Sequence, residues 1–289
     1  MPKAQDKARH SIKNMCKVLN ISEAGYYKWL RRQSHPYKYD ELLAKIRQIR
    51  AENPDYGAYR IYLHLQLYQG YTGSYYLILK LCKAHQLMLK KKWHAKGITK
   101  ADPAAQASAN LIQQDFSAAV PNQKWLGDIT EIPTAEGKLY VAAILDCFDG
   151  AIVGWKMADN MRAELCVDAF ISAANKYQAY GMIFHSDRGS QYTSRIYRGV
   201  LAKHGAIQSM SSTGKCYDNA RMESFFATLK KERIYKFKTE TMRMNTVKSL
   251  VFRFIEVYYN RKRIYTTNGG HPPLMKRSLY YQTRLPQAV

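Results

Sequence analysis

The first hundred residues alternate between stretches with apolar residues at helical spacing and short polar breaks. Apolar residues recur at this spacing up to Leu19, and a turn at Asn20 precedes Ser22, which can cap a second helix. Two short helices joined by a turn predict a helix-turn-helix in residues 1–35. The aromatic residues of its second helix either contact a ligand or pack a small core, and the pattern favours neither.

The helical pattern continues over residues 36–98. Apolar spacing predicts a helix around residues 42–49, a second over 59–69, and a third that Ser74 can cap. These helices predict a second small helical module of helix-turn-helix type. Residues 99–119 are rich in Ala, Ser and Gln without apolar spacing, which is typical of a linker.

Beyond residue 119 the spacing changes to that of strands. Strands are predicted at 125–132, 139–148 and 152–155, joined by turns that include the hairpin signal Asp149-Gly150. They are followed by a helix (163–177), a strand (181–184), a helix (194–204), a strand (206–210) and a final helix that Asp218 or Asn219 can cap. The order βββαβαβα predicts an α/β domain over residues 120–240, and residues 241–289 are expected to form a C-terminal helix and a basic tail.

Composition adds a strong positive charge to this outline. The chain of 289 residues carries 45 Lys and Arg against 22 Asp and Glu, a net charge of +23, and the excess is densest over residues 1–110. Such a chain attracts polyanions, so nucleic acid is the expected partner, and a ribosome-associated or merely soluble basic protein is the alternative. Basic residues in the helical front are candidate DNA contacts: Lys28, Arg31, Arg32, Lys90, Lys91 and Lys92.

The five cysteines are odd in number and widely spaced, and none forms a C-x-x-C pair. This pattern argues against a disulfide framework and against a zinc ribbon. Apolar runs are too short for a membrane span. The sequence therefore predicts a cytoplasmic, nucleoid-associated protein with no membrane partner.

Three carboxylates are the candidate chemistry. Asp128 falls in the middle of a predicted strand among apolar neighbours, where an unpaired charge is costly unless a cation lies beside it. Asp187 follows a short strand, and Glu223 borders the apolar stripe of the last predicted helix, with Lys230 two turns further on. Carboxylates that converge from separate elements are suited to hold two divalent ions for attack on a phosphodiester. Each alone would more often be a surface charge or a helix cap.

Four neighbouring residues are weighed against the same chemistry. A structural role is favoured for Asp146, and a core position is favoured for Trp125 over a base-stacking one. Glu131 alternates to the strand face opposite Asp128, so it is not expected to be a ligand. His185 either positions a phosphate or satisfies the loop backbone, and the sequence does not decide between them.

These residues lie in runs that resemble the bacterial insertion-sequence transposases of the "IS three" family, specifically their second-frame (OrfB) product, within the retroviral-integrase superfamily. In that family 35 residues separate the second Asp from the Glu, and 35 separate Asp187 from Glu223 here. The matching runs cover nearly the whole chain: residues 121–125, 128–130, 152–155, 185–192, 209–211, 218–220 and 222–225, then Tyr259, Asn260 and Arg263.

The resemblance implies an RNase H-like catalytic core, a mixed five-stranded sheet with flanking helices, preceded by small all-α helix-turn-helix modules. It implies that Asp128, Asp187 and Glu223 bind two Mg²⁺ or Mn²⁺ ions, and that Lys230 lies near the DNA. Further candidate DNA contacts around this site are Arg188, Lys215 and Arg221. The implied activity is cleavage of a DNA strand by water and attack of the freed 3′-hydroxyl on DNA.

The implied partners are double-stranded DNA with terminal inverted repeats, target DNA, and further copies of the chain in a synaptic homo-oligomer. Family members often fuse to an upstream helix-turn-helix frame, so such a partner or fusion is also expected. The chain departs from the family pattern at Asp149-Gly150, where Ser-Arg is usual, and at Tyr265, where His is usual. The alternatives are a catalytically silent transposase-derived regulator and a plain RNase H-type nuclease.

Overall fold

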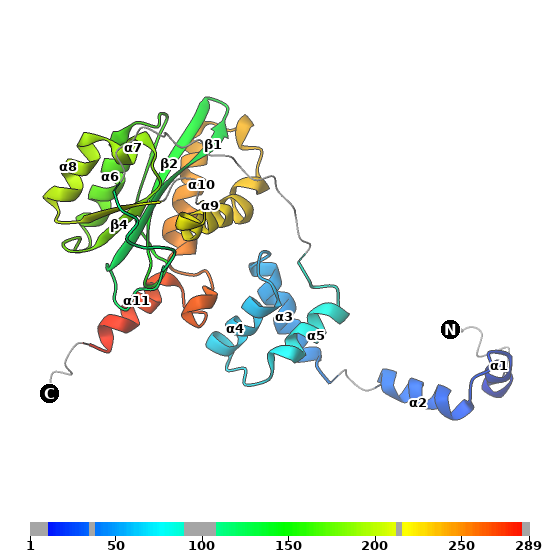
Figure 1. Ribbon diagram of the computed structural model, residues 1–289. Coiled ribbons are helices and arrows are strands. Elements are labelled where there is room, and N and C mark those ends of the chain that lie inside the picture. The colour runs from blue at the N-terminus through cyan, green and yellow to red at the C-terminus, as the bar shows by residue number, and fades with distance from the viewer. Residues whose placement is uncertain (1–10, 35–37, 90–107, 212–215, 285–289) are drawn as a thin grey trace. The chain divides into compact units, whose positions relative to one another are not determined.

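The computed structural model describes residues 11–34, 38–89, 108–211 and 216–284 (Figure 1). They fall within two compact units, Met1–Ile61 with Ser74–Met88, and Tyr62–Gly73 with Leu89–Val289. Among the described residues no helix has the length and apolar character needed to cross a membrane.

Five helices make up the front of the chain, and they confirm the predicted helix positions. They are α1 (Ile12–Val18), α2 (Glu23–Ser34), α3 (Asp40–Glu52), α4 (Ala58–Gln69) and α5 (Tyr75–Ala84). The hydroxyl of Ser22 accepts a hydrogen bond from the Gly25 N–H, and that of Ser74 accepts one from the Tyr76 N–H, as expected of caps. Helices α3 and α5 bury the apolar residues that predicted them, among them Ile46, Ile49 and Ile78.

A five-stranded mixed sheet forms the centre of the second unit. Its strands are β1 (Lys124–Thr134), β2 (Gly137–Asp146), β3 (Ile152–Ala158), β4 (Ile183–Ser186) and β5 (Ile207–Met210), in the order β3-β2-β1-β4-β5. The first three pair antiparallel, whereas β4 is parallel to both β1 and β5. The predicted order βββαβαβα is confirmed, and β4 begins and ends two residues later than expected.

Helices cover both faces of this sheet (Figure 1). On one face, α6 (Ala163–Ala174) and α8 (Arg195–Lys203) pack with Trp125, which is fully buried as predicted. On the other, α9 (Ala220–Glu232) and α10 (Met244–Phe252) pack with Leu126 and Ile132. Because successive side chains of a strand point to opposite faces, β1 contributes to both cores and is held from both sides.

Two segments that the sequence placed outside the core are part of it. Beyond residue 240, α10 and the π-helical segment Arg253–Tyr259 bury Val251, Phe254 and Tyr259 in the same core as α9. Before residue 120, Ile112 is buried there as well. Apolar spacing did not reveal Ile112 because a single buried residue in an irregular segment has no period.

Candidate active site

Asp128 lies in β1, opposite Ala143 of β2, and its carboxylate accepts a hydrogen bond from the Ile129 N–H at 2.8 Å. The preceding residue, Gly127, packs against the ring of Phe184 in β4, where a Cβ would come within 2.4 Å of the ring. Burial, and then the negative charges of Asp187 and Glu223, raise the pKa of Asp128 to about 8. This carboxylate therefore lies where a cation would be favourable.

Asp187 follows directly after β4. The parallel register pairs Leu126 with His185, so continuing it brings Asp187 level with Asp128. The Gly189 N–H donates to Asp187 Oδ1 at 3.0 Å, and burial raises the pKa of this carboxyl. The tight turn after β4 thus fixes the second carboxylate beside the first.

Glu223 lies in the first turn of α9, and its side chain is exposed. The predicted stripe on the same helix is confirmed, since Met222, Phe225, Phe226 and Leu229 are all buried. Its charge is close enough to raise the pKa of Asp128. Even so, within the described part of the chain no three His, Cys, Asp or Glu side chains are gathered tightly enough to hold an ion. Two carboxylates are thus fixed on the sheet and the third lies on a helix beside them.

Lys230, two turns after Glu223, is half-buried on α9. Burial lowers its pKa, while the charges of Glu131 and Asp128 act in the opposite direction. Lys230 is therefore a cation within electrostatic range of Asp128, where the sequence placed it.

The other basic candidates have different surroundings. Arg221 points into the fold, where it donates to the carbonyl oxygens of Phe116 and Cys147, and Arg188 donates through Nε to that of Ser211. Arg221 therefore forms hydrogen bonds inside the protein, whereas the sequence predicted that it contacts DNA. Lys28 and Arg31 lie exposed on α2. Lys90, Lys91, Lys92, Lys215 and the side chain of Arg32 lie outside the described residues.

His185 is buried, and the structure uses both nitrogens of its ring. Nδ1 lies 2.8 Å from Ser209 Oγ, and Nε2 lies 3.2 Å from Ser211 Oγ. Burial lowers the pKa of His185 to about 4, so the ring is neutral at pH 7. Of the two roles left open by the sequence, this arrangement favours the structural one.

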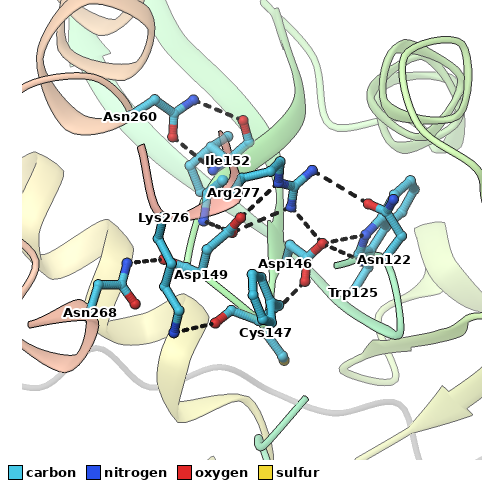
Figure 2. Close-up of polar contacts among 12 residues, drawn as sticks. Asn122, Trp125, Asp146, Cys147, Asp149, Ile152, Asn260, Asn268, Lys276 and Arg277 are labelled. Carbon is cyan, nitrogen blue, oxygen red and sulfur yellow. Dashed lines mark hydrogen bonds and ion pairs between the residues drawn. The ribbon is translucent and has the colours of Figure 1, made fainter. Parts of the chain in front are cut away.

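A second acidic cluster lies at the end of β2 (Figure 2). Arg277 of α11 (Pro273–Gln282) donates to Asp146 at 2.6 Å and to Asp149 at 2.7 Å, and all three side chains are buried. Trp125 Nε1 and the Asn122 N–H also donate to Asp146. The structural role favoured for Asp146 is confirmed. The role of Arg277 was missed, because nothing in its local sequence shows that α11 returns to the sheet.

The C-terminal segment holds the same turn at two further points (Figure 2). The Asn260 side chain bonds both backbone groups of Ile152 at 2.9 Å, and Asn268 donates to the carbonyl oxygen of Asp149 at 2.8 Å. Asp149-Gly150 is therefore more than a hairpin signal, since the carboxylate of Asp149 is an ion-pair partner.

Comparison with known proteins identifies relatives of this chain. The family model for the integrase core domain matches residues 118–216. The InsF transposase of insertion sequence IS3A from Escherichia coli (strain K12) is 34% identical over 273 residues, which cover 92% of this chain and 94% of that protein. A 31 kDa protein of insertion element IS600 from Shigella sonnei is 34% identical over 275 residues, 93% of this chain and 99% of that one.

Solved structures give more distant likenesses. A simian T-cell lymphotropic virus intasome, in complex with a PP2A regulatory subunit, has 14% identity and a TM-score of 0.47 over 85% of this chain and 76% of that one. The catalytic core domain of BIV integrase has 16% identity and a TM-score of 0.43 over 56% of this chain and 98% of that one.

The mixed sheet, its flanking helices and the matched core model define an integrase-type catalytic domain, a class of polynucleotidyl transferases. The identity with InsF, which extends over nearly the whole of both chains, narrows this class. The chain belongs to the IS3 family of insertion-sequence transposases and acts in DNA transposition.

Proposed function

We propose that Asp128, Asp187 and Glu223 together bind two divalent ions, Mg²⁺ or Mn²⁺, and that this site cleaves and joins DNA strands. The observation that carries the proposal is the convergence of three carboxylates, one in β1, one at the end of β4 and one on α9. The Asp128 carboxylate is half-buried near the other two, and its pKa is raised to about 8. Three oxygen-bearing side chains are the ligand type that Mg²⁺ prefers, and a divalent cation would relieve the repulsion among them.

Asp128 and Asp187 form the fixed part of this site, because strands on both sides and a tight turn hold them. Glu223 completes it by turning its exposed side chain towards them. Bound ions would make the attacking oxygen more nucleophilic and stabilise the leaving oxygen. Lys230, whose charge acts on Asp128, would bind a DNA phosphate beside the reacting one.

The proposed reaction has two displacements at phosphorus. Water attacks the phosphodiester at an element end, so that the bond to the 3′ oxygen breaks and a 3′-hydroxyl is freed. That hydroxyl then attacks a phosphodiester of the target DNA, forms a new bond to phosphorus and releases the target's own 3′-oxygen. No protein nucleophile is needed in either step. The terminal inverted repeats and the target are the DNA partners, and synapsis of two ends requires a homo-oligomer.

Partners outside the active site are proposed on weaker grounds. The net charge of +23 supports association with the nucleoid. Exposed Lys28 and Arg31 on α2 supply sequence-independent contacts with phosphates. A fusion to an upstream frame, or a separate upstream-frame partner, would add further recognition of the element ends.

The test uses the full chain and DNA that carries the ends of its insertion sequence. Strand cleavage and strand transfer are measured with Mg²⁺, with Mn²⁺, and with EDTA. We expect activity with either ion and none with EDTA, and we expect Glu223→Gln to lower the rate by at least about a thousandfold, roughly 4 kcal/mol of transition-state stabilisation. Glu240→Gln, at an exposed glutamate, is the matched control.

Full strand transfer by Glu223→Gln would overturn the assignment of the site. A wild-type chain that binds the ends and never nicks them would identify a silent regulator. Cleavage of the RNA strand of a hybrid, without transfer to target DNA, would identify a plain nuclease.

A further inference from the structure

Asp218 and Asn219 lie at the junction between the turn Cys216–Asn219 and α9, five and four residues before Glu223. Both are buried, with 1% and 5% of their surface exposed. The sequence predicted that one of them caps the helix. Asn219 does occupy the capping position, but its side chain makes no capping hydrogen bond. A buried polar residue that leaves its helix uncapped points to another role for its amide.

The Asn219 amide is directed to β1 instead of to its own helix. Its Nδ2 donates to the carbonyl oxygen of Gly127 at 3.2 Å, in the peptide bond that joins Gly127 to Asp128. Its Oδ1 is buried without a hydrogen-bond partner among the described residues. A buried acceptor without a partner is costly. Asn219 nevertheless keeps its bond to β1, and α9 begins without a side-chain cap. Asn219 therefore ties the start of the Glu223 helix to the backbone of Asp128.

Asp218 connects the same junction to the Asp187 strand. The backbone of Asp218 lies within hydrogen-bonding range of the buried side chain of His185, two residues before Asp187. Asp218 and Asn219 thus contact residues one or two positions before the two sheet carboxylates, and they lie at the start of the helix that carries the third.

A segment from before the sheet holds Asp218 from the other side. In this strap, residues 108–117, Asn110 Nδ2 donates to Asp218 Oδ2 at 2.9 Å and Gln114 Nε2 donates to Oδ1 at 3.1 Å. The strap is itself fixed, since the Leu111 N–H donates to Ser209 Oγ and Arg221 of α9 holds the carbonyl oxygen of Phe116.

The backbone of the strap is strained where it meets Asp218. Gln113 and Gln114 have φ of 48° and 65°, in the left-handed region that side chains other than glycine rarely adopt. The Asn110 side chain stabilises this bend by accepting from the N–H groups of Ile112 and Gln113. Strain of this kind persists only where the surroundings hold it, and it commonly accompanies function. Here it delivers the Gln114 amide to Asp218.

We propose that Asp218 and Asn219 are positioning residues for the transposase site, and that the strap sets their position through Asn110 and Gln114. The inference rests on the proposed metal site, because the position that matters is that of Glu223 relative to Asp128 and Asp187. Residues that orient metal ligands commonly change metal affinity by about tenfold to a hundredfold when they are altered. The strap also comes directly after the segment that joins the helical front to the core, so it connects that segment to the catalytic helix.

The test is a matched pair of variants in the full chain, Gln114→Glu and Gln113→Glu. Both residues are exposed, adjacent and left-handed, and both variants add the same charge. Only residue 114 faces Asp218, where a glutamate would replace a hydrogen bond by repulsion between carboxylates. We expect Gln114→Glu to raise the Mg²⁺ concentration for half-maximal strand cleavage about tenfold, with an unchanged KM for DNA. Gln113→Glu is expected to match the wild type.

A second measurement needs no catalysis. Backbone hydrogen exchange of the metal-free protein is expected to be faster at residues 219–223 in Gln114→Glu, and unchanged there in Gln113→Glu. A variant that is only destabilised would have a lower Tm and an unchanged half-saturating Mg²⁺ concentration. Equal Mg²⁺ dependence and equal exchange in the two variants would overturn the inference. If the wild type cleaves with Mg²⁺ in that same experiment, the proposed function stands while the positioning role fails.

Discussion

Two groups of carboxylates lie at or beside β1, and they differ in what neutralises them. Beside the start of β1, where Asp146 of β2 pairs with Trp125, Asp146 and Asp149 share the guanidinium of Arg277 (Figure 2). Three residues further along β1, Asp128 has Asp187 and Glu223 as its charged neighbours, with Lys230 as a weaker opposite influence. The same side-chain chemistry therefore forms a closed ion-pair cluster in one place and an uncompensated one in the other.

The difference shows how a fold separates structural charge from functional charge. The cluster around Arg277 is satisfied within the protein, so it fixes the C-terminal segment to the β2–β3 turn. Among the described residues, the group around Asp128 has only the weaker influence of Lys230 against its negative charges, and this imbalance raises the pKa of Asp128. Changes that reverse these two states test the contrast.

The largest effect is expected from Arg277→Ala. This change leaves two carboxylates buried without their cation, and breaking a buried pair from one side typically costs about 3–5 kcal/mol of stability. Urea unfolding followed by circular dichroism measures the loss. The control is Arg284→Ala. Arg284 is exposed, follows the end of the same helix, and lies over the ring of Tyr280.

The same cluster offers a compensated variant. Arg277→Met combined with Asp146→Asn and Asp149→Asn removes all three charges together, and most of the lost stability is expected to return. If the single and the triple variants were equally unstable, packing of the arginine stem would account for the loss, and the ion pairs would not.

A smaller effect of opposite sign is expected from Asp128→Asn. The pKa of Asp128 is about 8 in the folded chain and about 3.9 when unfolded. Between these values the unfolded carboxyl has ionised while the folded one still holds its proton, so stability falls as pH rises through this window. Asparagine does not ionise. Without metal, the variant should therefore be more stable than the wild type at pH 8, by an amount that shrinks to nearly nothing at pH 4.

Thermal unfolding at both pH values in EDTA measures this difference. If the Asp128→Asn variant were less stable than the wild type at pH 8, the Asp128 carboxylate would already have favourable partners inside the protein. The comparison with the Arg277 cluster would then fail.

The smallest effect is a shift on adding metal. Mg²⁺ at ten times its Kd adds about 1.4 kcal/mol to the stability of a protein that binds it only when folded. This corresponds to a rise in Tm of a few degrees for a unit of this size. We expect the rise in the wild type and its absence in Asp128→Asn, with Arg284→Ala behaving as the wild type. An equal rise in all three proteins would place the ions elsewhere.

Much of the catalytic fold could be predicted because its elements have strong local signals. Alternation along β1, the apolar run of β2 and the stripe of α9 each follow from residues close in sequence. The C-terminal segment and the strap could not be placed, since their positions depend on contacts across about a hundred residues. The Asn260 bonds to Ile152 and the Gln114 bond to Asp218 are of this kind.

For the candidate site as well, the sequence predicted what local signals indicate and missed what depends on tertiary contacts. Strand position and spacing predicted Asp128, Asp187 and Glu223 as a group, and the structure places their charges within range of one another. Sequence alone did not reveal which nearby polar residues are already satisfied. Arg221 was expected to contact DNA, yet it bonds two backbone carbonyl oxygens inside the fold, and only tertiary structure shows that.

The most direct measurement of the central claim is anomalous diffraction from crystals of the full chain grown with Mn²⁺. The account predicts two manganese peaks that contact Asp128, Asp187 and Glu223, with the Glu223 side chain turned towards the sheet, and loss of at least one peak in Asp128→Asn. Manganese bound only at other residues, or both peaks retained in that variant, would contradict it.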